Sequence, residues 1–360
     1  MAGIYGVLGV AETERVFLNT LGQATVYDAI NEYMAMHNAE LAATLGVFVG
    51  ETTTDFKKRY YLPGGGRLQN MGFSPQGAPA AVKTSGYWDV AFPLNEWGAG
   101  LAGNRIAYAY ATVQDLAREV EGVRMRDVAT VRYEILNALL GSTQTTFADP
   151  LNGTLYIEPL ANGDSVVYPP VLGSETEATD THYLESGYTV ANISDTNNPF
   201  VTIVNELEEH FGAPTGGSNI VTFVSSDITA KAQALTDFVA VTDMRIMPGD
   251  DTATVMGLPA GLPGRILGTV SGAWVVEWRH LPATYTVSIH LDAPAPLAMR
   301  VDPSYTGLGS GLQLVSTNDK YPFTESFYSH RFGVAAANRL NGVVMEIAAG
   351  GSYSVPTGYL

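Results

Sequence analysis

The sequence predicts an α+β protein, and three observations lead to that fold class. First, 38 glycines and 19 prolines among 360 residues, with only 15% charged side chains, favour many turns and strands over a helical bundle. Second, apolar residues keep helical spacing over an unusually long stretch, 113–140. Third, short alternating segments typical of strands follow at 264–270, 273–278 and 285–291.

Composition excludes several classes of protein. A hydrophobic fraction of 46% excludes wholesale disorder, and without cysteine the chain has no disulfide framework and no thiolate metal site. The net charge of −17 argues against a protein that grips nucleic acid, because such proteins need a basic footprint. No apolar run is long enough for a spanning helix, and the N-terminal residues do not have the pattern of a signal peptide.

Two helices are expected in the first half of the chain. The first covers about 26–45, with Thr25 as its N-cap and Gly46 at its end. The second covers 113–140, where Thr112 and Asp115 have the spacing of a capping box. At 1.5 Å per residue the second helix is a rod of about 42 Å, which is long for a globular protein.

The second half is expected to mix strands and short helices. The segment 199–211 is predicted to be a helix, because Asn198 can cap it, Pro199 suits its first position and Gly212 can end it. A second short helix is expected within 227–239. Further strands are expected within 154–171 and at 220–224, 327–334 and 342–347.

Between the two long helices, residues 52–105 have no core pattern. This segment is rich in glycine and proline, yet it carries eight aromatic residues, which argues against plain disorder. Within 55–105 there are six basic and three acidic side chains, a local charge of +3 that leaves −20 elsewhere. We therefore expect an extended arm that docks onto a neighbouring copy of the chain. The candidate contact residues are Lys57, Lys58, Arg59, Tyr60, Tyr61, Arg67, Trp88 and Trp97.

The sequence offers no catalytic, cofactor-binding or metal site. The six histidines are scattered without the spacing of a zinc motif. Ser310 lacks the flanking glycines of a nucleophile elbow, and the glycines at 64–66 lack the Gly-Lys-Ser/Thr ending of a phosphate loop. We expect no enzyme and no cofactor.

The order of elements, with particular residues, resembles the major capsid protein of tailed bacteriophages, the Hong Kong 97-type fold. No single piece carries the resemblance, which covers nearly the whole chain from about residue 25. The pieces are ATVRYEILNALLG at 129–141, LANGD at 160–164, NNPF at 197–200, EHFG at 209–212, GGSNIVTF at 216–223, VVEW at 275–278, LP at 281–282, PLAMR at 296–300, RFGV at 331–334 and NR at 338–339.

The resemblance implies a division of the chain into five parts. They are an N-terminal arm and helix at 1–51, an extended hairpin called the E-loop at 52–105, a peripheral domain with the spine helix 113–140 at 106–194, an axial domain at 195–320, and the return strands of the peripheral domain at 321–360.

The resemblance also implies a structural function. Hexamers and pentamers of the chain would form an icosahedral head around double-stranded DNA, bound without sequence specificity, in a virion assembled in the host cytoplasm. The chain has no room before the arm for the family's fused scaffolding region, so we expect either a separate scaffolding protein or a chain that is already processed. A portal and a decoration protein are expected as further partners, and no membrane. Some relatives join an E-loop lysine to an asparagine; Lys57, Lys58, Lys83, Asn338 and Asn341 are available here, but no motif selects a pair.

Three alternatives stay open from the sequence. An encapsulin-like cargo compartment resembles the same fold and would be recognised by a cargo protein that purifies with the shell. A β-rich surface or adhesion protein is disfavoured by the lack of a signal sequence. A carboxylate-pair hydrolase is the third alternative, but spacing identifies no acidic pair.

Overall fold

The computed structural model describes residues 23–61, 87–104, 112–212, 219–241, 262–302, 311–320 and 323–359. The chain divides into two compact units, each of which is described by itself. The first unit comprises Met1–Ala43, Leu94–Glu134 and Val301–Gly333; the second comprises Thr44–Pro93, Ile135–Arg300 and Val334–Leu360.

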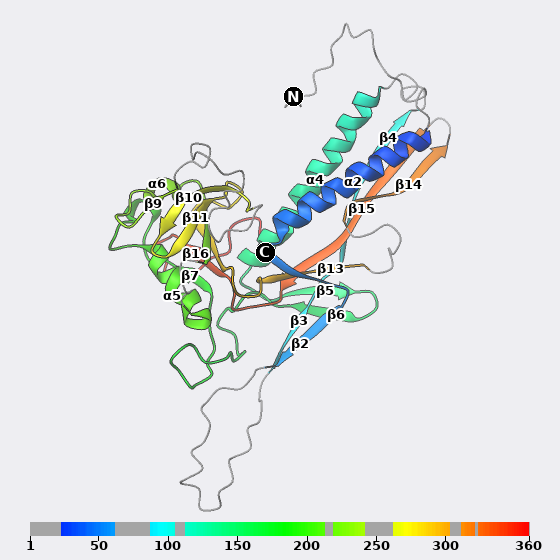
Figure 1. Ribbon diagram of the computed structural model, residues 1–360. Coiled ribbons are helices and arrows are strands. Elements are labelled where there is room, and N and C mark those ends of the chain that lie inside the picture. The colour runs from blue at the N-terminus through cyan, green and yellow to red at the C-terminus, as the bar shows by residue number, and fades with distance from the viewer. Residues whose placement is uncertain are drawn as a thin grey trace, which may run out of the picture. The chain divides into compact units, whose positions relative to one another are not determined.

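In the first unit two helices pack on three antiparallel strands of a five-stranded sheet (Figure 1). The central strand β15 pairs with β14 on one side and with β4 on the other. Met34 of α2 and Val120 and Val123 of α4 form one apolar cluster with Leu314 and Tyr328 of the sheet. The elements are α2 Gln23–Leu45, β4 Asn95–Asn104, α4 Val113–Leu140, β14 Gln313–Lys320 and β15 Phe323–Ala336, of which α2, α4 and β15 end in the second unit.

The predicted bounds of the long helix are confirmed, and so is its cap. The Thr112 backbone N–H donates to Asp115 Oδ2 at 3.1 Å, while the Asp115 N–H donates to Thr112 Oγ1 at 3.2 Å, the reciprocal pattern of a capping box. The predicted cap of the first helix is wrong. Helix α2 begins at Gln23, so Thr25 lies inside its first turn.

A buried carboxylate joins both helices to the sheet in the first unit. Asp127 of α4 accepts hydrogen bonds from His37 Nε2 of α2 at 2.8 Å and from His330 Nδ1 of β15 at 2.6 Å. Burial by itself would raise the pKa of Asp127, but the hydrogen bonds from His330 and His37 overcome that effect and hold this pKa below its usual value. The ionised carboxylate is therefore the form that the folded state favours.

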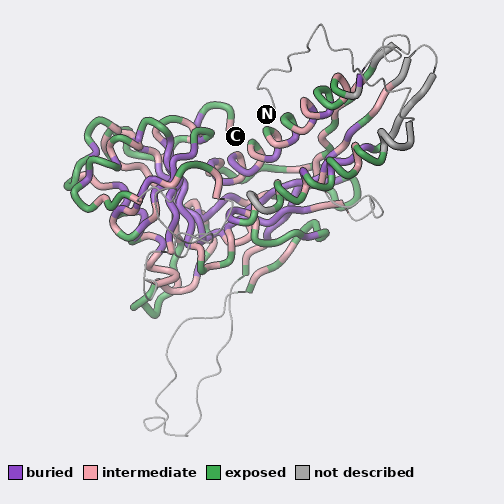
Figure 2. Tube along the Cα trace, turned by 45° about the horizontal axis from the view of Figure 1, so that its top comes forward, coloured by how far each residue is buried: buried purple, intermediate pink, exposed green. Residues whose placement is uncertain are grey.

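The second unit is built around a seven-stranded mixed sheet in the order β7-β16-β12-β8-β11-β10-β9. Every residue of β8 and β12 is buried, and Figure 2 shows these strands within the largest buried region of the unit. Phe200, Ile203 and Leu207 of α5 pack on the sheet. The elements are β7 Tyr183–Glu185, the 3-10 helix η2 Val190–Asn192, α5 Pro199–Phe211, β8 Ile220–Val224, α6 Thr229–Ala232, β9 Val239–Ala240, β10 Arg265–Val270, β11 Ala273–Glu277, β12 Tyr285–His290 and β16 Val343–Glu346.

Helix α5 has the ends that the sequence predicts. The Phe200 N–H donates to Asn198 Oδ1 at 3.0 Å, Pro199 is the first helical residue, and Gly212 ends the helix with φ of 79°, where a side chain would be strained. The amphipathic pattern places Phe200, Ile203 and Leu207 in the core.

Two further strands of the five-stranded sheet and two separate hairpins complete the second unit. β1 Val49–Thr53 runs parallel to β13 Leu297–Val301, whereas β2 Lys57–Tyr61 with β3 Tyr87–Ala91, and β5 Thr145–Asp149 with β6 Gly153–Ile157, are antiparallel hairpins. The buried Arg300 side chain donates to Asp149 Oδ2 at 2.9 Å and to the Phe92 carbonyl at 3.0 Å. This cation ties β13 to the ends of β3 and β5.

Two expected elements are shorter than predicted. The helix expected within 227–239 is only α6; beyond it the Ala234 and Leu235 N–H groups donate to carbonyls three residues back, and the Thr236 N–H donates to Asp195 Oδ1 at 2.8 Å. Around 166–168 there is an isolated bridge between Tyr168 and Ala178, since Asp164 Oδ1 takes the Val166 N–H in a turn. Among the described residues no helix is both long and apolar enough to cross a bilayer.

The expectation that 52–105 contributes no core is wrong for part of this range. Val90, Ala91 and Phe92 are buried, and β4 pairs with β15 over its whole length. The pattern was hidden because a three-residue buried run between glycines and prolines is too short to show a period. The five-part division itself remains a prediction.

The Asp127 cluster predicts a defined pH dependence of stability. Because the folded-state pKa is lowered, the stabilisation is complete above the unfolded pKa of about 4 and is lost as the pH falls through the folded pKa. Asp127→Asn should lower the free energy of unfolding by about 2 kcal/mol at pH 7, measured by urea unfolding. The difference in the free energy of unfolding between wild type and Asp127→Asn should become smaller below about pH 4. Glu32→Gln, on an exposed position of α2, is the control. A gap that stays constant down to pH 2 would contradict this assignment.

Candidate subunit-contact surface

The structure brings together six of the eight residues predicted to contact a neighbouring subunit. Lys57, Lys58, Arg59, Tyr60 and Tyr61 form strand β2, and Trp88 lies opposite Tyr60 on strand β3. Trp97 belongs to β4 of the first unit, where its ring contacts Phe332. Arg67 lies outside the described residues.

One face of the β2–β3 hairpin is buried against the second unit. Because side chains alternate along a strand, Lys58, Tyr60, Trp88 and Val90 share this face. The rings of Tyr60 and Trp88 stack with their centroids 5.5 Å apart. They lie against the apolar cluster formed by Val90, Phe92, Ala298 and Ala335. This packing holds the hairpin in place.

The opposite face is exposed and carries both charge and aromatic rings. Lys57 Nζ lies 2.6 Å from Asp89 Oδ2, and Arg59 donates to both oxygens of Asp89 at 2.6 and 2.9 Å. The Arg59 guanidinium also lies 3.9 Å from the centroid of the Tyr87 ring. Tyr61 and Tyr87, directly opposite each other, are 71% and 55% exposed. We call Lys57, Arg59, Tyr61, Tyr87 and Asp89 the outer face.

The charges of the outer face are already paired within the hairpin. The Arg59 hydrogen bonds, with those of Lys57, lower the pKa of Asp89 to about 2, and Lys58 pairs with Glu51. The sequence predicted that the positive charge of this segment selects its position on a neighbour. In the described part of the segment, these three cations instead form ion pairs with carboxylates of their own subunit. The exposed rings of Tyr61 and Tyr87 are therefore the groups of this face that another subunit would bury.

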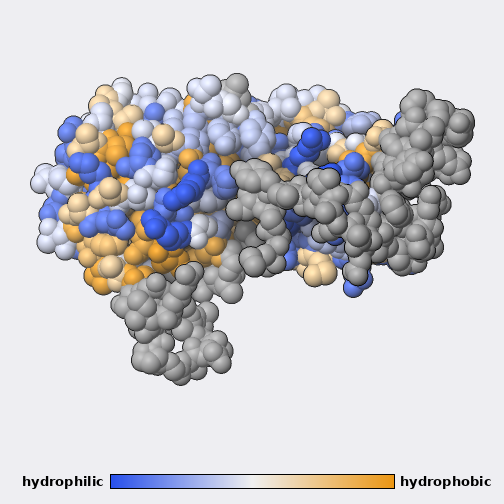
Figure 3. Space-filling model, turned by 90° about the horizontal axis from the view of Figure 1, so that it is seen from above, coloured by the Kyte–Doolittle hydropathy of each residue, from blue (hydrophilic) through white to orange (hydrophobic). Residues whose placement is uncertain are grey.

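The neighbouring β5–β6 hairpin exposes further apolar side chains. Ile157 of β6 packs with Tyr60 and Trp88, so the two hairpins are adjacent (Figure 1). Leu151, in the turn of the second hairpin, is 93% exposed, and Tyr156 is also exposed. Figure 3 shows the molecule from above, a view in which apolar and hydrophilic side chains alternate over the visible face. Exposed apolar groups that gather on adjacent elements are typical of a protein contact surface.

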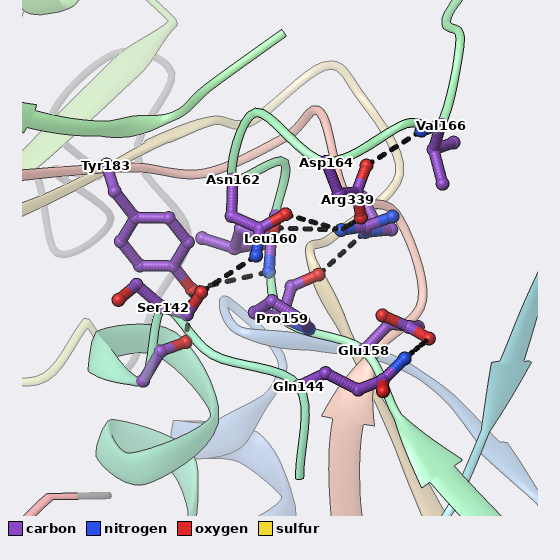
Figure 4. Close-up of polar contacts among 11 residues, drawn as sticks. Ser142, Gln144, Glu158, Pro159, Leu160, Asn162, Asp164, Val166, Tyr183 and Arg339 are labelled. Carbon is purple, nitrogen blue, oxygen red and sulfur yellow. Dashed lines mark hydrogen bonds and ion pairs between the residues drawn. The ribbon is translucent and has the colours of Figure 1, made fainter. Parts of the chain in front are cut away.

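A buried arginine organises the segments below these hairpins (Figure 4). The Arg339 side chain is fully buried and donates from Nε to the Pro159 carbonyl at 2.7 Å and from Nη2 to Asp164 Oδ2 at 2.7 Å. Tyr183 donates to the Gly141 carbonyl at 2.6 Å and accepts from the Leu160 N–H at 3.3 Å. The motifs at 160–164 and 338–339, which carried part of the sequence resemblance, therefore meet in space.

The two asparagines considered for a cross-link are engaged inside their own subunit. Asn341 is fully buried, accepts from the His290 N–H at 2.8 Å and donates to the Pro294 carbonyl at 2.8 Å. Asn338 donates to the same Pro294 carbonyl at 3.0 Å. Both side chains thus act as supports for the backbone.

Two groups of side chains within the described residues have ligand atoms close enough for a metal ion. They are Asp180 with His182 and His210, and Asp180 with Glu206 and Glu209. The sequence analysis missed them, because 28 residues separate the two histidines and no zinc motif has that spacing. The one signal available was the helical spacing of Glu206, Glu209 and His210, which puts them on one face of α5.

Comparison with solved structures shows the fold. A chain from Mycobacterium phage Patience aligns with a TM-score of 0.67 and 18% identity, covering 98% of this chain and 100% of that chain. Weaker alignments reach the capsid of the native GTA particle, with a TM-score of 0.49 and 12% identity over 86% of this chain and 91% of that one, and the capsid of Myoviridae Phage XM1, with 0.47 and 11% over 85% and 92%. The sequence matches no protein-family model, and no curated protein matches it either. The α+β Hong Kong 97-type fold predicted from the sequence is confirmed, and the chain shares it with a protein of a Mycobacterium phage.

The Arg339 network predicts a large loss of stability on truncation. Arg339→Ala should lower the free energy of unfolding by about 3 kcal/mol, because Asp164 and two backbone carbonyls lose their donor. Arg279→Ala is the matched control, since the Arg279 side chain is largely exposed, and it should change stability by less than about 0.5 kcal/mol. Denaturant unfolding measures both, and equal losses in the two variants would contradict the role of Arg339.

Proposed function

We propose that this chain is the major capsid protein of a tailed bacteriophage, assembling as hexamers and pentamers into an icosahedral head around double-stranded DNA. The observation that carries the proposal is the fold, which the chain shares over almost its full length with a protein of a Mycobacterium phage. The role is structural, not enzymatic, and the finished protein resides in the virion after assembly in the host cytoplasm.

The charge of the chain suits this role. A shell must enclose a concentrated polyanion without binding it tightly, and a net charge of −17 keeps the average interaction with DNA repulsive. The proposed partners of the chain are other copies of itself, with a separate scaffolding protein, a portal and a decoration protein during and after assembly.

Within the shell, we assign the outer face of the β2–β3 hairpin to the contact with an adjacent subunit. Its tyrosines are exposed although its opposite face is buried, so the hairpin is held in place while the Tyr61 ring, and the Tyr87 ring beside Arg59, stay largely exposed among the described residues. Aromatic side chains at such positions supply much of the affinity of protein interfaces at a small cost in side-chain entropy. The five-part division predicted from the sequence, with 52–105 as the E-loop, 106–194 as peripheral domain and 195–320 as axial domain, is part of the same proposal.

The test replaces the exposed rings and leaves the paired charges intact. The double variant Tyr61→Ser, Tyr87→Ser should fold normally by circular dichroism but should form few or no shells in negative-stain microscopy and light scattering. Each truncation at a buried aromatic contact costs about 1–2 kcal/mol, and the loss recurs at every subunit of the shell. Tyr133→Ser, which removes an exposed ring from α4, is the control and should assemble normally.

The outcomes distinguish failure of the proposed capsid function from failure of the proposed contact role of the outer face. If the double variant forms shells as stable as those of wild type, the outer face is not the contact. If wild type, expressed with the scaffolding protein of its own phage, gives only monomers and dimers, the capsid function is wrong. Shells that contain a specific cargo protein would indicate an encapsulin-like compartment instead.

A further inference from the structure

A cluster of two histidines and three carboxylates lies between the end of α5 and the segment that leads into β7. Asp180 and His182 come from that segment, while Glu206, Glu209 and His210 lie on one face of the last turns of α5. All five residues belong to the second unit. Neither the fold nor the proposed capsid function accounts for this cluster.

The geometry of the cluster is convergent. His182 Nε2 lies 2.9 Å and His210 Nε2 lies 2.7 Å from the same atom, Asp180 Oδ2. The ligand atoms of these three residues lie within 4.8 Å of one another, as do those of Asp180, Glu206 and Glu209. The histidine side chains are almost fully buried, and that of Asp180 is only 16% exposed.

A hydrogen bond to a backbone carbonyl fixes the orientation of the His182 ring. Its Nδ1 lies 2.9 Å from the Gly342 carbonyl oxygen, which can only accept, so Nδ1 carries a hydrogen. The lone pair of Nε2 would then face a carboxylate oxygen unless a positive species lies between them. Metal-binding histidines characteristically donate their second N–H to a backbone carbonyl, which aims the other nitrogen at the ion.

The charges around the cluster favour a divalent cation over a single proton as the positive species between the histidines and Asp180. Among the described residues, no lysine or arginine pairs with Asp180, Glu206 or Glu209, although these three carboxylates converge. The cluster also lies at the C-terminal end of α5, where the helix dipole contributes further negative potential.

We propose that Asp180, His182 and His210 bind a divalent first-row transition ion, with a carboxylate oxygen of Glu206 or Glu209 as the fourth donor. Two imidazole nitrogens with carboxylate oxygen suit borderline ions such as Zn²⁺. Bonds of about 2.0–2.1 Å in tetrahedral geometry separate the ligand atoms by about 3.3 Å, so the side chains need to move apart by only about half an ångström. The ion fastens α5 to the segment before β7.

The test uses untagged full-length protein that has been stripped with EDTA and titrated with Zn²⁺ by calorimetry at pH 7.5. Wild type should bind one ion per chain with a dissociation constant of about 1 µM or tighter and should melt at a higher temperature when loaded. X-ray absorption at the zinc edge should show two imidazole ligands with oxygen completing the shell. Absence of binding, or a zinc shell without two imidazoles, would overturn the proposal.

Variants locate the site. Asp180→Asn and His210→Gln should each weaken Zn²⁺ binding at least about tenfold. His280→Gln, which changes an exposed histidine outside the cluster, should bind as wild type does. Unchanged affinity in His210→Gln would place the ion elsewhere and refute the assignment. If Asp180→Asn does not fold, His210→Gln and the wild-type absorption spectrum still decide.

Discussion

Burial of the central sheet on both faces is the constraint on which the second unit depends. Strands β8 and β12 have no exposed residue, so polar groups within them depend on hydrogen-bond partners in the protein, although the His290 ring at the end of β12 has none among the described residues. Ser288 of β12 donates to Thr222 of β8 at 2.9 Å, and the backbone groups pair with β11 and β16 on the outer sides. Side chains that carry charge are thereby confined to the edges of the sheet and to the connections, where Asp180, His182 and Arg339 lie.

The β2–β3 hairpin differs from the central sheet, because only one of its faces is buried. Stacking of Tyr60 on Trp88 anchors it, while the ion pairs of Asp89 with Lys57 and Arg59 stiffen the exposed side. Exposed ion pairs contribute little to stability, so their effect is chiefly to hold the hairpin in one geometry. A rigid element with two exposed rings loses little entropy on association, which is the property that a subunit contact requires.

The sequence predicted the elements whose signals are local and strong. The bounds 113–140 and 199–211 follow from capping residues at Thr112 and Asn198 and from a sustained helical period, and both agree with the structure. Prediction failed where long-range contacts decide. Beyond the end of α6 the Thr236 N–H is taken by Asp195, 41 residues away, and strand β4, half of it glycine and alanine, is a strand because β15 pairs with it.

In the candidate sites too, the sequence predicted what depends on local signals and missed what depends on long-range contacts. The aromatic and basic character of β2 was visible in the sequence, but the alternation that assigns Tyr60 inward and Tyr61 outward requires the pairing partner β3. The sequence also could not reveal that Asp89 takes up the charge of two cations. The convergence of His182 and His210 on Asp180 depends wholly on the docking of α5, which no local spacing encodes.

The central claim is that the outer face of the hairpin is completed by another copy of the chain. A cryo-electron microscopy reconstruction of assembled particles, at a resolution that shows side chains, tests it most directly. We predict that Tyr61 and Tyr87 become buried against an adjacent subunit while the Lys57–Asp89–Arg59 pairs persist within the hairpin. A map of closed shells in which both rings remain in solvent would contradict the account.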